Sequence, residues 1–299
     1  MPWLQIKIDT TPAHAEVLEE LLLATGANAV TLEDGADQPL FEPTRGTTPL
    51  WQQTRITGLF DAEQDSKAMI EALQSGWGSV FPDQPFPAAR LEILEDKDWE
   101  REWMENFHPI QVGNRLWICP SWKEAPAPEA TNLVLDPGLA FGTGTHPTTF
   151  MCLEWLDQHD VSGQTVIDYG CGSGILGVAA LLLGAEKAYG VDNDPQALIA
   201  SRENTDRNSL PAESFDVYYP GEIGEVKADL MLANILAGPL IDLAPTLAIL
   251  VKDQGNLVLS GILSHQADEV IAAYRPWFDF KPVHQKEEWV CLSATKVQS

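Results

Sequence analysis

Apolar and polar positions alternate along the first hundred residues in a way that predicts strands separated by two helices. Trp3–Ile8 has the pattern of a strand, and Thr11-Pro12 predicts the start of a helix that ends near Gly26. The remaining elements predicted here are strands at 29–32, 55–60 and 90–94 and a helix at 66–73. The order β-α-β-β-α-β is that of a ferredoxin-like α+β domain, which we assign to residues 1–95.

The pattern changes after this domain. We assign residues 96–130 to a linker, because they combine a short charged helix predicted at 98–105 with a proline-containing stretch around a strand at 117–122. Residues 131–299 alternate strand and helix, which predicts a second α/β domain with a doubly wound sheet. Within the first domain, the long loop from Gly35 to Gln53 is a candidate for partner contact.

A glycine-rich stretch in the second domain carries the clearest chemical signal. Thr165–Ile167 is a β-branched run, residues 168–174 read DYGCGSG, and an apolar helical stripe begins at Ile175. This spells strand, tight turn and helix, in which Gly170 and Gly172 leave bare backbone for a ligand. The next predicted strand ends at Asp192, a position from which a carboxylate can accept both hydroxyls of a ribose.

These features together predict a cofactor that contains a nucleoside. The spacing G-x-G-x-G differs from the dinucleotide pattern G-x-G-x-x-G, because Ile175 stands where the latter needs glycine. S-adenosylmethionine is therefore favoured over NAD, and a nicotinamide-dependent oxidoreductase remains the alternative. A plain α/β turn with a solvated Asp192 is the least demanding interpretation. Cys171 lies within the turn, and we interpret it as a small filler rather than a nucleophile.

The last strands of the chain refine the fold class. A helix is predicted at 147–158 and a capped helix start at Asp194-Pro195. Strands are expected at 215–219, 230–233, 256–260, 278–282 and 289–294. The final connection, Val283–Glu288, is too short for a parallel crossover, so the last pair should be antiparallel. Seven strands with such a pair are typical of class I methyltransferases, a Rossmann-like α/β fold.

The composition indicates which classes of macromolecule the protein is expected to bind. The chain of 299 residues is 44% hydrophobic and has a formal net charge of −26, with acidic residues in excess in both halves. Such a surface repels a phosphate backbone, so no nucleic acid is expected, whereas a basic protein would be attracted. The N-terminal sequence lacks a signal peptide pattern, no apolar run would span a membrane, and four scattered cysteines suggest neither a metal site nor disulfides. A cytoplasmic protein is expected.

Several segments carry a resemblance to a known family. They are residues 136–149 (DPGLAFGTGTHPTT), 168–174, 234–237 (NILA), 261–263 (GIL) and 287–289 (EEW). On these, the whole chain resembles the bacterial ribosomal protein methyltransferases of the PrmA family, which modify protein eleven of the large subunit. The resemblance implies transfer of methyl groups from S-adenosylmethionine to lysine or N-terminal amino groups of that basic protein, with the first domain gripping the substrate.

The resemblance also implies site residues. It places cofactor contacts at Thr149, Gly170, Asp192 and Asn234, with Asn234 as the candidate catalytic residue. The glycine turn adds Asp168 and Gly172, and Phe141 is expected to pack on the cofactor. Two of these residues have simpler interpretations: Asn234 as the cap of a helix near Ala237, and Thr149 as helix surface. His146, before a proline at a helix start, is interpreted as structural.

The NILA segment indicates which type of nitrogen is methylated, because it lacks residues that recognise a planar nitrogen. Methyltransferases acting on planar amide or adenine nitrogens carry two prolines and an aromatic residue after this asparagine, whereas this chain has Ile235, Leu236 and Ala237. An sp³ amine is therefore favoured. A free lysine has a pKa of about 10.4, so we expect an apolar, carboxylate-poor mouth around Asn234 that favours the neutral amine. A non-catalytic acidic module that binds a basic protein is a further alternative.

Overall fold

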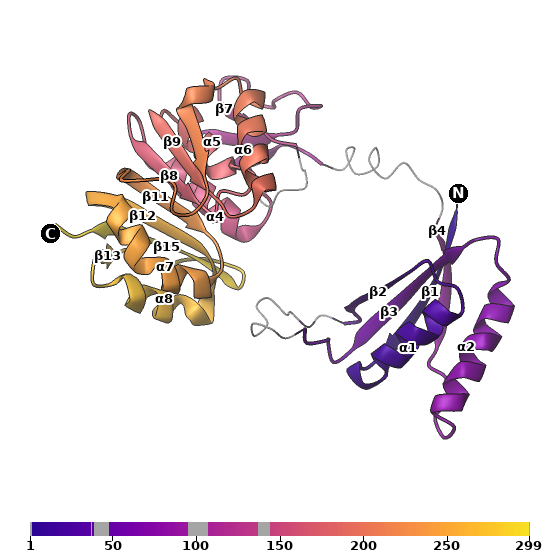
Figure 1. The fold of residues 1–299 in the computed structure, drawn as a ribbon. Helices are drawn as coiled ribbons and strands as arrows, with labels where there is room; N and C mark the ends of the chain where they lie inside the picture. Colours follow the sequence, from indigo (N-terminus) through magenta and orange to yellow (C-terminus); the bar gives the residue numbers. More distant parts are fainter. Residues whose placement is uncertain (1, 37, 39–47, 95–106, 137–143, 299) are drawn as a thin grey trace. The chain divides into compact units, whose positions relative to one another are not determined.

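The computed structural model describes residues 2–36, 38, 48–94, 107–136 and 144–298. The chain divides into two compact units, Met1–Met104 and Glu105–Ser299, each with its own buried core (Figure 1). The predicted helix at 98–105, the middle of the loop Gly35–Gln53 and the candidate Phe141 lie outside the described residues. No helix in the described part of the chain has the length and apolar character needed to cross a membrane.

The first unit has the element order that the sequence predicts. Its elements are β1 (Trp3–Thr10), α1 (Pro12–Ala24), β2 (Ala29–Asp34), β3 (Thr54–Asp61), α2 (Ser66–Val80) and β4 (Ala89–Leu94). The strands form an antiparallel sheet in the order β2-β3-β1-β4. Leu4, Ile6 and Ile8 alternate along β1 and are buried in one core with residues of both helices. Helix α2 continues beyond its predicted end at Leu73 because Trp77 also packs into this core.

The second unit is built on one large mixed sheet. Its strands are β8 (Thr165–Tyr169), β9 (Lys187–Val191), β10 (Phe215–Tyr218), β11 (Ala228–Asn234), β12 (Val251–Leu263), β13 (Phe278–Phe280), β14 (His284–Lys286) and β15 (Trp289–Lys296). They lie in the order β10-β9-β8-β11-β12-β15-β13, and β14 pairs with β15. The pairs from β10 to β12 are parallel, and β15 is antiparallel to both β12 and β13, as predicted for the last strands. The strand β14 lies within the connection 283–288, for which the sequence pattern predicts no strand.

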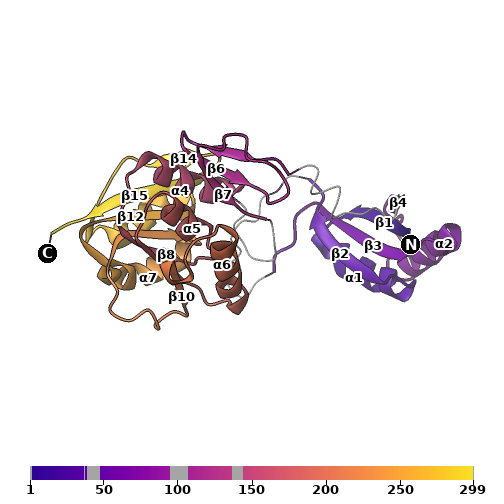
Figure 2. The ribbon, with the colours of Figure 1, turned by 90° about the horizontal axis from the view of Figure 1, so that it is seen from above.

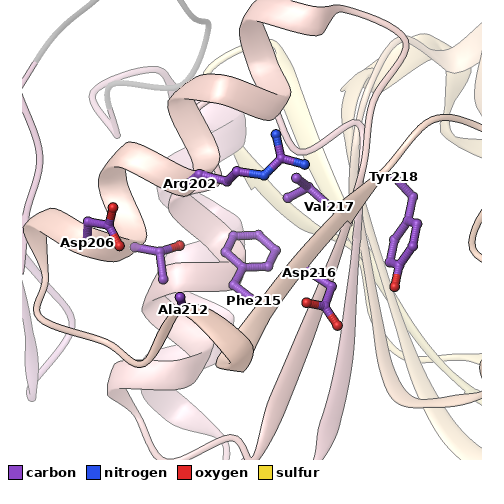
Figure 3. A pocket seen from close by; sticks show the side chains of 8 residues that line it. Arg202, Asp206, Ala212, Phe215, Asp216, Val217 and Tyr218 are labelled. Atoms are coloured by element: carbon purple, nitrogen blue, oxygen red, sulfur yellow. The ribbon is translucent and has the colours of Figure 1, made fainter.

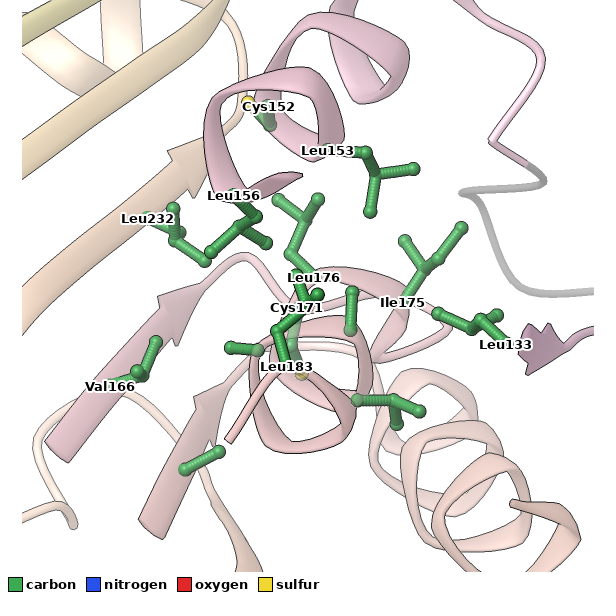
Figure 4. Packing of buried hydrophobic residues seen from close by; sticks show 14 of the residues in the cluster. Leu133, Cys152, Leu153, Leu156, Val166, Cys171, Ile175, Leu176, Leu183 and Leu232 are labelled. Carbon is green, nitrogen blue, oxygen red and sulfur yellow. The ribbon is translucent and has the colours of Figure 1, made fainter. Parts of the chain in front are cut away.

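Helices cover both faces of this sheet (Figures 1 and 2). They are α4 (Pro147–Gln158), α5 (Ile175–Leu182), α6 (Pro195–Arg207), α7 (Ala237–Leu250) and α8 (Ala267–Tyr274), with short 3-10 turns at Ala212–Ser214 and Ser264–Gln266. Along β11, Leu230 and Leu232 face the core beneath α4 and α5, while Met231 and Ala233 face the core beneath α7 and α8. Figure 4 shows α4 and α5 meeting through interleaved apolar side chains. Residues buried on both faces explain why the strands read as continuous apolar runs.

Residues 107–130, the described part of the segment assigned to a linker, contribute to the second unit. They contain β5 (Ile110–Val112) and β6 (Leu116–Cys119), which form a three-stranded sheet with β7 (Thr131–Val134). Leu116 and Ile118 are fully buried in the core beneath α4 and α5. The carboxylate of Asp157, at the end of α4, accepts the N–H groups of residues 114–116 at 2.7, 2.7 and 2.9 Å. These contacts fix the β5–β6 turn. Because its strands are short and prolines lie near them, the sequence pattern does not predict this three-stranded sheet.

Candidate active site

The glycine turn lies between β8 and α5, at the carboxyl end of the parallel strands. Gly170, Gly172 and Gly174 have φ values of +78°, +53° and +75°, a region that residues with a side chain rarely adopt. The N–H of Gly170 donates to the carbonyl of Val191 at 2.6 Å, which ties the turn to the end of β9. A carbon added at Gly174 would lie 2.8 Å from the hydroxyl of Ser201, so this position has no room for a side chain.

Asp168 lies behind this turn and is 1% exposed. Its Oδ2 accepts the N–H of Gly177 at 3.0 Å. Helix α5 begins after Gly174, which has no side chain to cap it, so Asp168 from the preceding strand satisfies one of the free N–H groups of the first turn. Burial raises the pKa of Asp168 to about 7, and the negative charge of Asp192 adds to this, although the bond from Gly177 works in the opposite direction. Asp168 therefore supports the turn from beneath.

Asp192 follows β9 and is held by backbone groups on both sides. Its Oδ2 accepts the N–H of Gly172 at 2.9 Å, and its Oδ1 accepts the N–H of Asp194 at 3.0 Å. Two bonds fix the plane of the carboxylate, while each oxygen keeps a lone pair for another donor. The sequence placed Gly172 and Asp192 in one site, and the fold brings them into direct contact.

Asn234 and Thr149, which are 85 residues apart in sequence, also meet. The amide Nδ2 of Asn234, at the end of β11, donates to the hydroxyl of Thr149 at 3.0 Å. Thr149 is 1% exposed, so its interpretation as ordinary helix surface is wrong. The cap of α7 is Leu236, and it has no side-chain bond to the helix, so Asn234 does not serve as its N-cap residue. With Nδ2 engaged by Thr149, the amide oxygen of Asn234 is the atom that can accept from a ligand.

The sequence also matches known proteins along its whole length. Residues 2–297 match the family model described as ribosomal protein L11 methyltransferase (PrmA). The chain belongs to this family. A ribosomal protein L11 methyltransferase of Cellvibrio japonicus is 58% identical over 299 residues and covers 100% of both chains, and one of Marinobacter nauticus is 56% identical over 296 residues, 99% of each.

A solved structure agrees with this membership. The crystal structure of ribosomal protein L11 methylase from Lactobacillus delbrueckii subsp. bulgaricus is 30% identical, with a TM-score of 0.59, and the match covers 64% of this chain and 100% of that one. The prediction of the PrmA family and of the class I methyltransferase fold is thereby confirmed. As a member of the ribosomal protein L11 methyltransferase family, the protein is an enzyme that uses S-adenosylmethionine, and the oxidoreductase and non-catalytic alternatives are set aside.

Two residues near the site have the structural roles expected of them. His146 caps α4 in this member of the L11 methyltransferase family: its Nδ1 lies 3.4 Å from the N–H of Thr148, and its ring meets that of Trp289 edge-on at 5.1 Å. Cys171 is buried within the glycine turn, and its sulfur accepts the Ser201 hydroxyl at 3.4 Å. Burial raises the pKa of the Cys171 thiol far above its usual range, which favours the neutral thiol and agrees with a packing role.

One cavity of about 330 Å³ lies elsewhere, between α6 and the edge strand β10 (Figure 3). Arg202 and Asp206 line it from the helix, and Phe215 and Asp216 from the strand. None of the predicted site residues belongs to its lining. The site of the L11 methyltransferase fold is therefore defined by the strand ends and their hydrogen bonds, and not by this cavity.

The fold gives Ile235 a contact within the site that the sequence pattern did not predict. Ile235 follows Asn234, and a carbon added at Gly170 would lie 2.2 Å from its Cγ2. The Ile235 side chain thus occupies the space beside Gly170 and connects the glycine turn with the NILA segment. Its signal in the sequence was only its position directly after the asparagine, because an isolated apolar residue carries no periodicity.

Proposed function

We propose that the protein methylates amino nitrogens of ribosomal protein L11, on lysine side chains, the N-terminus or both, and that Asn234 is the catalytic residue. The hydrogen bond between Asn234 and Thr149 carries this proposal. It turns the amide oxygen of Asn234 into a fixed acceptor for an amine N–H at the carboxyl edge of the sheet, where open α/β folds bind ligands. Fixing the direction of the amine lone pair is the main assistance that a displacement of this kind needs.

The residues of the glycine turn fit S-adenosylmethionine. Gly170, whose Cβ side faces Ile235, and Gly172 let the turn backbone approach the methionine part, and the anchored carboxylate of Asp192 can accept the two ribose hydroxyls. When bound, S-adenosylmethionine supplies a methyl group activated by a positively charged sulfur. Thr149 is proposed to hold the orientation of Asn234, and Asp168 to keep the start of α5 in place beneath the cofactor.

The surroundings of Asn234 support a neutral amine as the acceptor. Ile235 is half-buried and Leu236 is 45% exposed, so the residues that follow Asn234 present apolar surface next to it. Apolar surroundings disfavour the charged form of a lysine and so lower its pKa. We therefore expect kcat/KM to rise with pH until the substrate amine is neutral.

The unit Met1–Met104 is proposed to bind the substrate, and the segment after residue 95 to join it to the methyltransferase unit. A net charge of −26 favours a basic protein such as a ribosomal protein and disfavours a nucleic acid. The four cysteines are free, in keeping with a reducing cytoplasm, where ribosomal proteins are made.

The test uses purified L11, labelled S-adenosylmethionine and mass spectrometry of the product. We expect Asn234→Ala to lower kcat roughly 10- to 100-fold, the worth of one hydrogen bond to a reacting group, with little change in cofactor affinity. The control is Asn256→Ala, which removes an asparagine in the middle of the neighbouring strand β12, in register with Leu230 of β11. If calorimetry shows instead that Asn234→Ala weakens cofactor binding and leaves kcat intact, the amide holds the cofactor and the catalytic assignment is wrong.

A further inference from the structure

Gly261 interrupts the regular pairing of β12. The register between β12 and β15 shifts between Leu259 and Ile262, so that Ser260 and Gly261 form a bulge. Gly261 has a φ of +82° at this point. On its other side, β12 still pairs with β11, and Ser260 is in register with Asn234. The bulge therefore lies directly beside the residue proposed to bind the amine.

The space in front of Gly261 is filled by the main chain of Ile235. A carbon added at Gly261 would lie 2.3 Å from the carbonyl oxygen of Ile235, 2.7 Å from its carbonyl carbon and 3.1 Å from its nitrogen. These atoms belong to the backbone and cannot rotate out of the way as a side chain can. The side chain of the same residue lies against Gly170, where an added carbon would be 2.2 Å from Cγ2 of Ile235. The NILA segment thus passes between two glycines, Gly170 in the turn that follows β8 and Gly261 in β12.

We propose that Gly261 is a positioning residue for methyl transfer: by leaving space for the main chain of Ile235, it holds the Asn234 amide against Thr149. Any side chain at 261 would push Ile235 by about 1 Å to reach an ordinary contact of 3.4 Å. Because Asn234 is its direct neighbour, its amide would move by a similar amount. A displacement of about 1 Å at a reacting group can cost roughly 100-fold in rate. The proposal rests on the function proposed for Asn234.

Two substitutions separate the collision from the backbone strain. Gly261→Ala introduces both, whereas Gly261→Asn introduces at least the same Cβ collision with less backbone strain, because asparagine tolerates positive φ. The matched control is Gly163→Ala. Gly163 has a φ of +67°, precedes β8 at the opposite edge of the sheet, and would place its added carbon more than 4 Å from any neighbour. The full-length protein is used throughout, with L11 as substrate.

We expect both Gly261 variants to lower kcat roughly 100-fold, with cofactor affinity by calorimetry changed less than about threefold and the thermal transition retained. Gly163→Ala should keep the wild-type kcat. In the Asn234→Ala background, Gly261→Asn should have little further effect, because both changes act through one amide.

Wild-type kcat in a folded Gly261→Asn protein would overturn the positioning role. So would loss of folding and of cofactor binding in both Gly261 variants, which would assign the glycine to stability alone. A full further loss in the Asn234→Ala background would also overturn it. If Asn234→Ala itself retains wild-type kcat, the proposed function of Asn234 fails, whatever the glycine variants do, so the two failures are distinguishable.

Discussion

Replacing Asp168 with asparagine should change how the stability of the cofactor-free protein depends on pH. Asp168 is 1% exposed, and burial raises its pKa from 3.8 in a model compound to about 7. In the unfolded chain the carboxyl loses its proton near pH 4, while in the folded protein it keeps the proton until about pH 7. Asparagine has no proton to lose, and its amide oxygen can still accept the N–H of Gly177.

The direction in which stability changes with pH follows from the number of protons that each state binds. Between about pH 4 and pH 7 the folded state binds more protons at this site than the unfolded state does, so stability falls as the pH rises. The contribution of Asp168 is fully present below pH 4 and is lost as the pH passes through 7. A shift of about 3 pKa units at about 1.4 kcal/mol each amounts to roughly 4 kcal/mol, an order-of-magnitude value for a group without exposure.

The difference in stability between the wild type and Asp168→Asn is measured by urea unfolding at about pH 4.5 and about pH 8. These two values span the window of roughly pH 4 to 7. The wild-type protein should lose several kcal/mol relative to Asp168→Asn between these two values, about 4 at most. Asp229→Asn is the flat control, because Asp229 titrates only below about pH 4 and its contribution to stability does not change between the two pH values. Burial raises the pKa of Asp229, but the N–H of Thr165 and the ammonium of Lys252 lower it more, so the net shift is downward. Parallel pH curves for the wild type and Asp168→Asn would show that the buried carboxyl does not titrate as inferred.

Three further outcomes are expected. Asp192→Ala should weaken cofactor binding roughly 100-fold in calorimetry, because two charge-assisted bonds to the ribose are lost. The control Asp194→Ala removes only a helix cap and should cost about 1 kcal/mol of stability. Equal cofactor affinities of the two variants would contradict the ribose assignment. Asp157→Ala should lower the free energy of unfolding by about 3 kcal/mol, because three N–H groups lose their acceptor, and an unchanged urea midpoint would contradict this. The native protein should not react with a thiol reagent, since Cys171 and the other cysteines are buried; rapid labelling would contradict their burial.

The sequence by itself determined the features that are local along the chain. The glycines from 170 to 174 need positive φ wherever they stand, so their spacing revealed the turn. Proline and acid at 194–195 marked the start of α6, and the short connection before β15 required an antiparallel partner. Strand β9 had to end where its apolar run ended, which placed Asp192 beside the turn. Each of these inferences depends only on residues close together in sequence.

The tertiary structure decided which distant residues meet. Thr149 bonds to Asn234 because α4 packs across the end of β11, and Gly261 faces Ile235 because β12 is the next strand in the sheet. Strand order across a sheet leaves no period in the sequence, so neither contact was visible there. The same holds for residues 107–130: the sequence predicts a strand at 117–122, but only the core shows that this segment packs into the second unit. The sequence determines which side chains are available for the site, and long-range packing determines which of them come together.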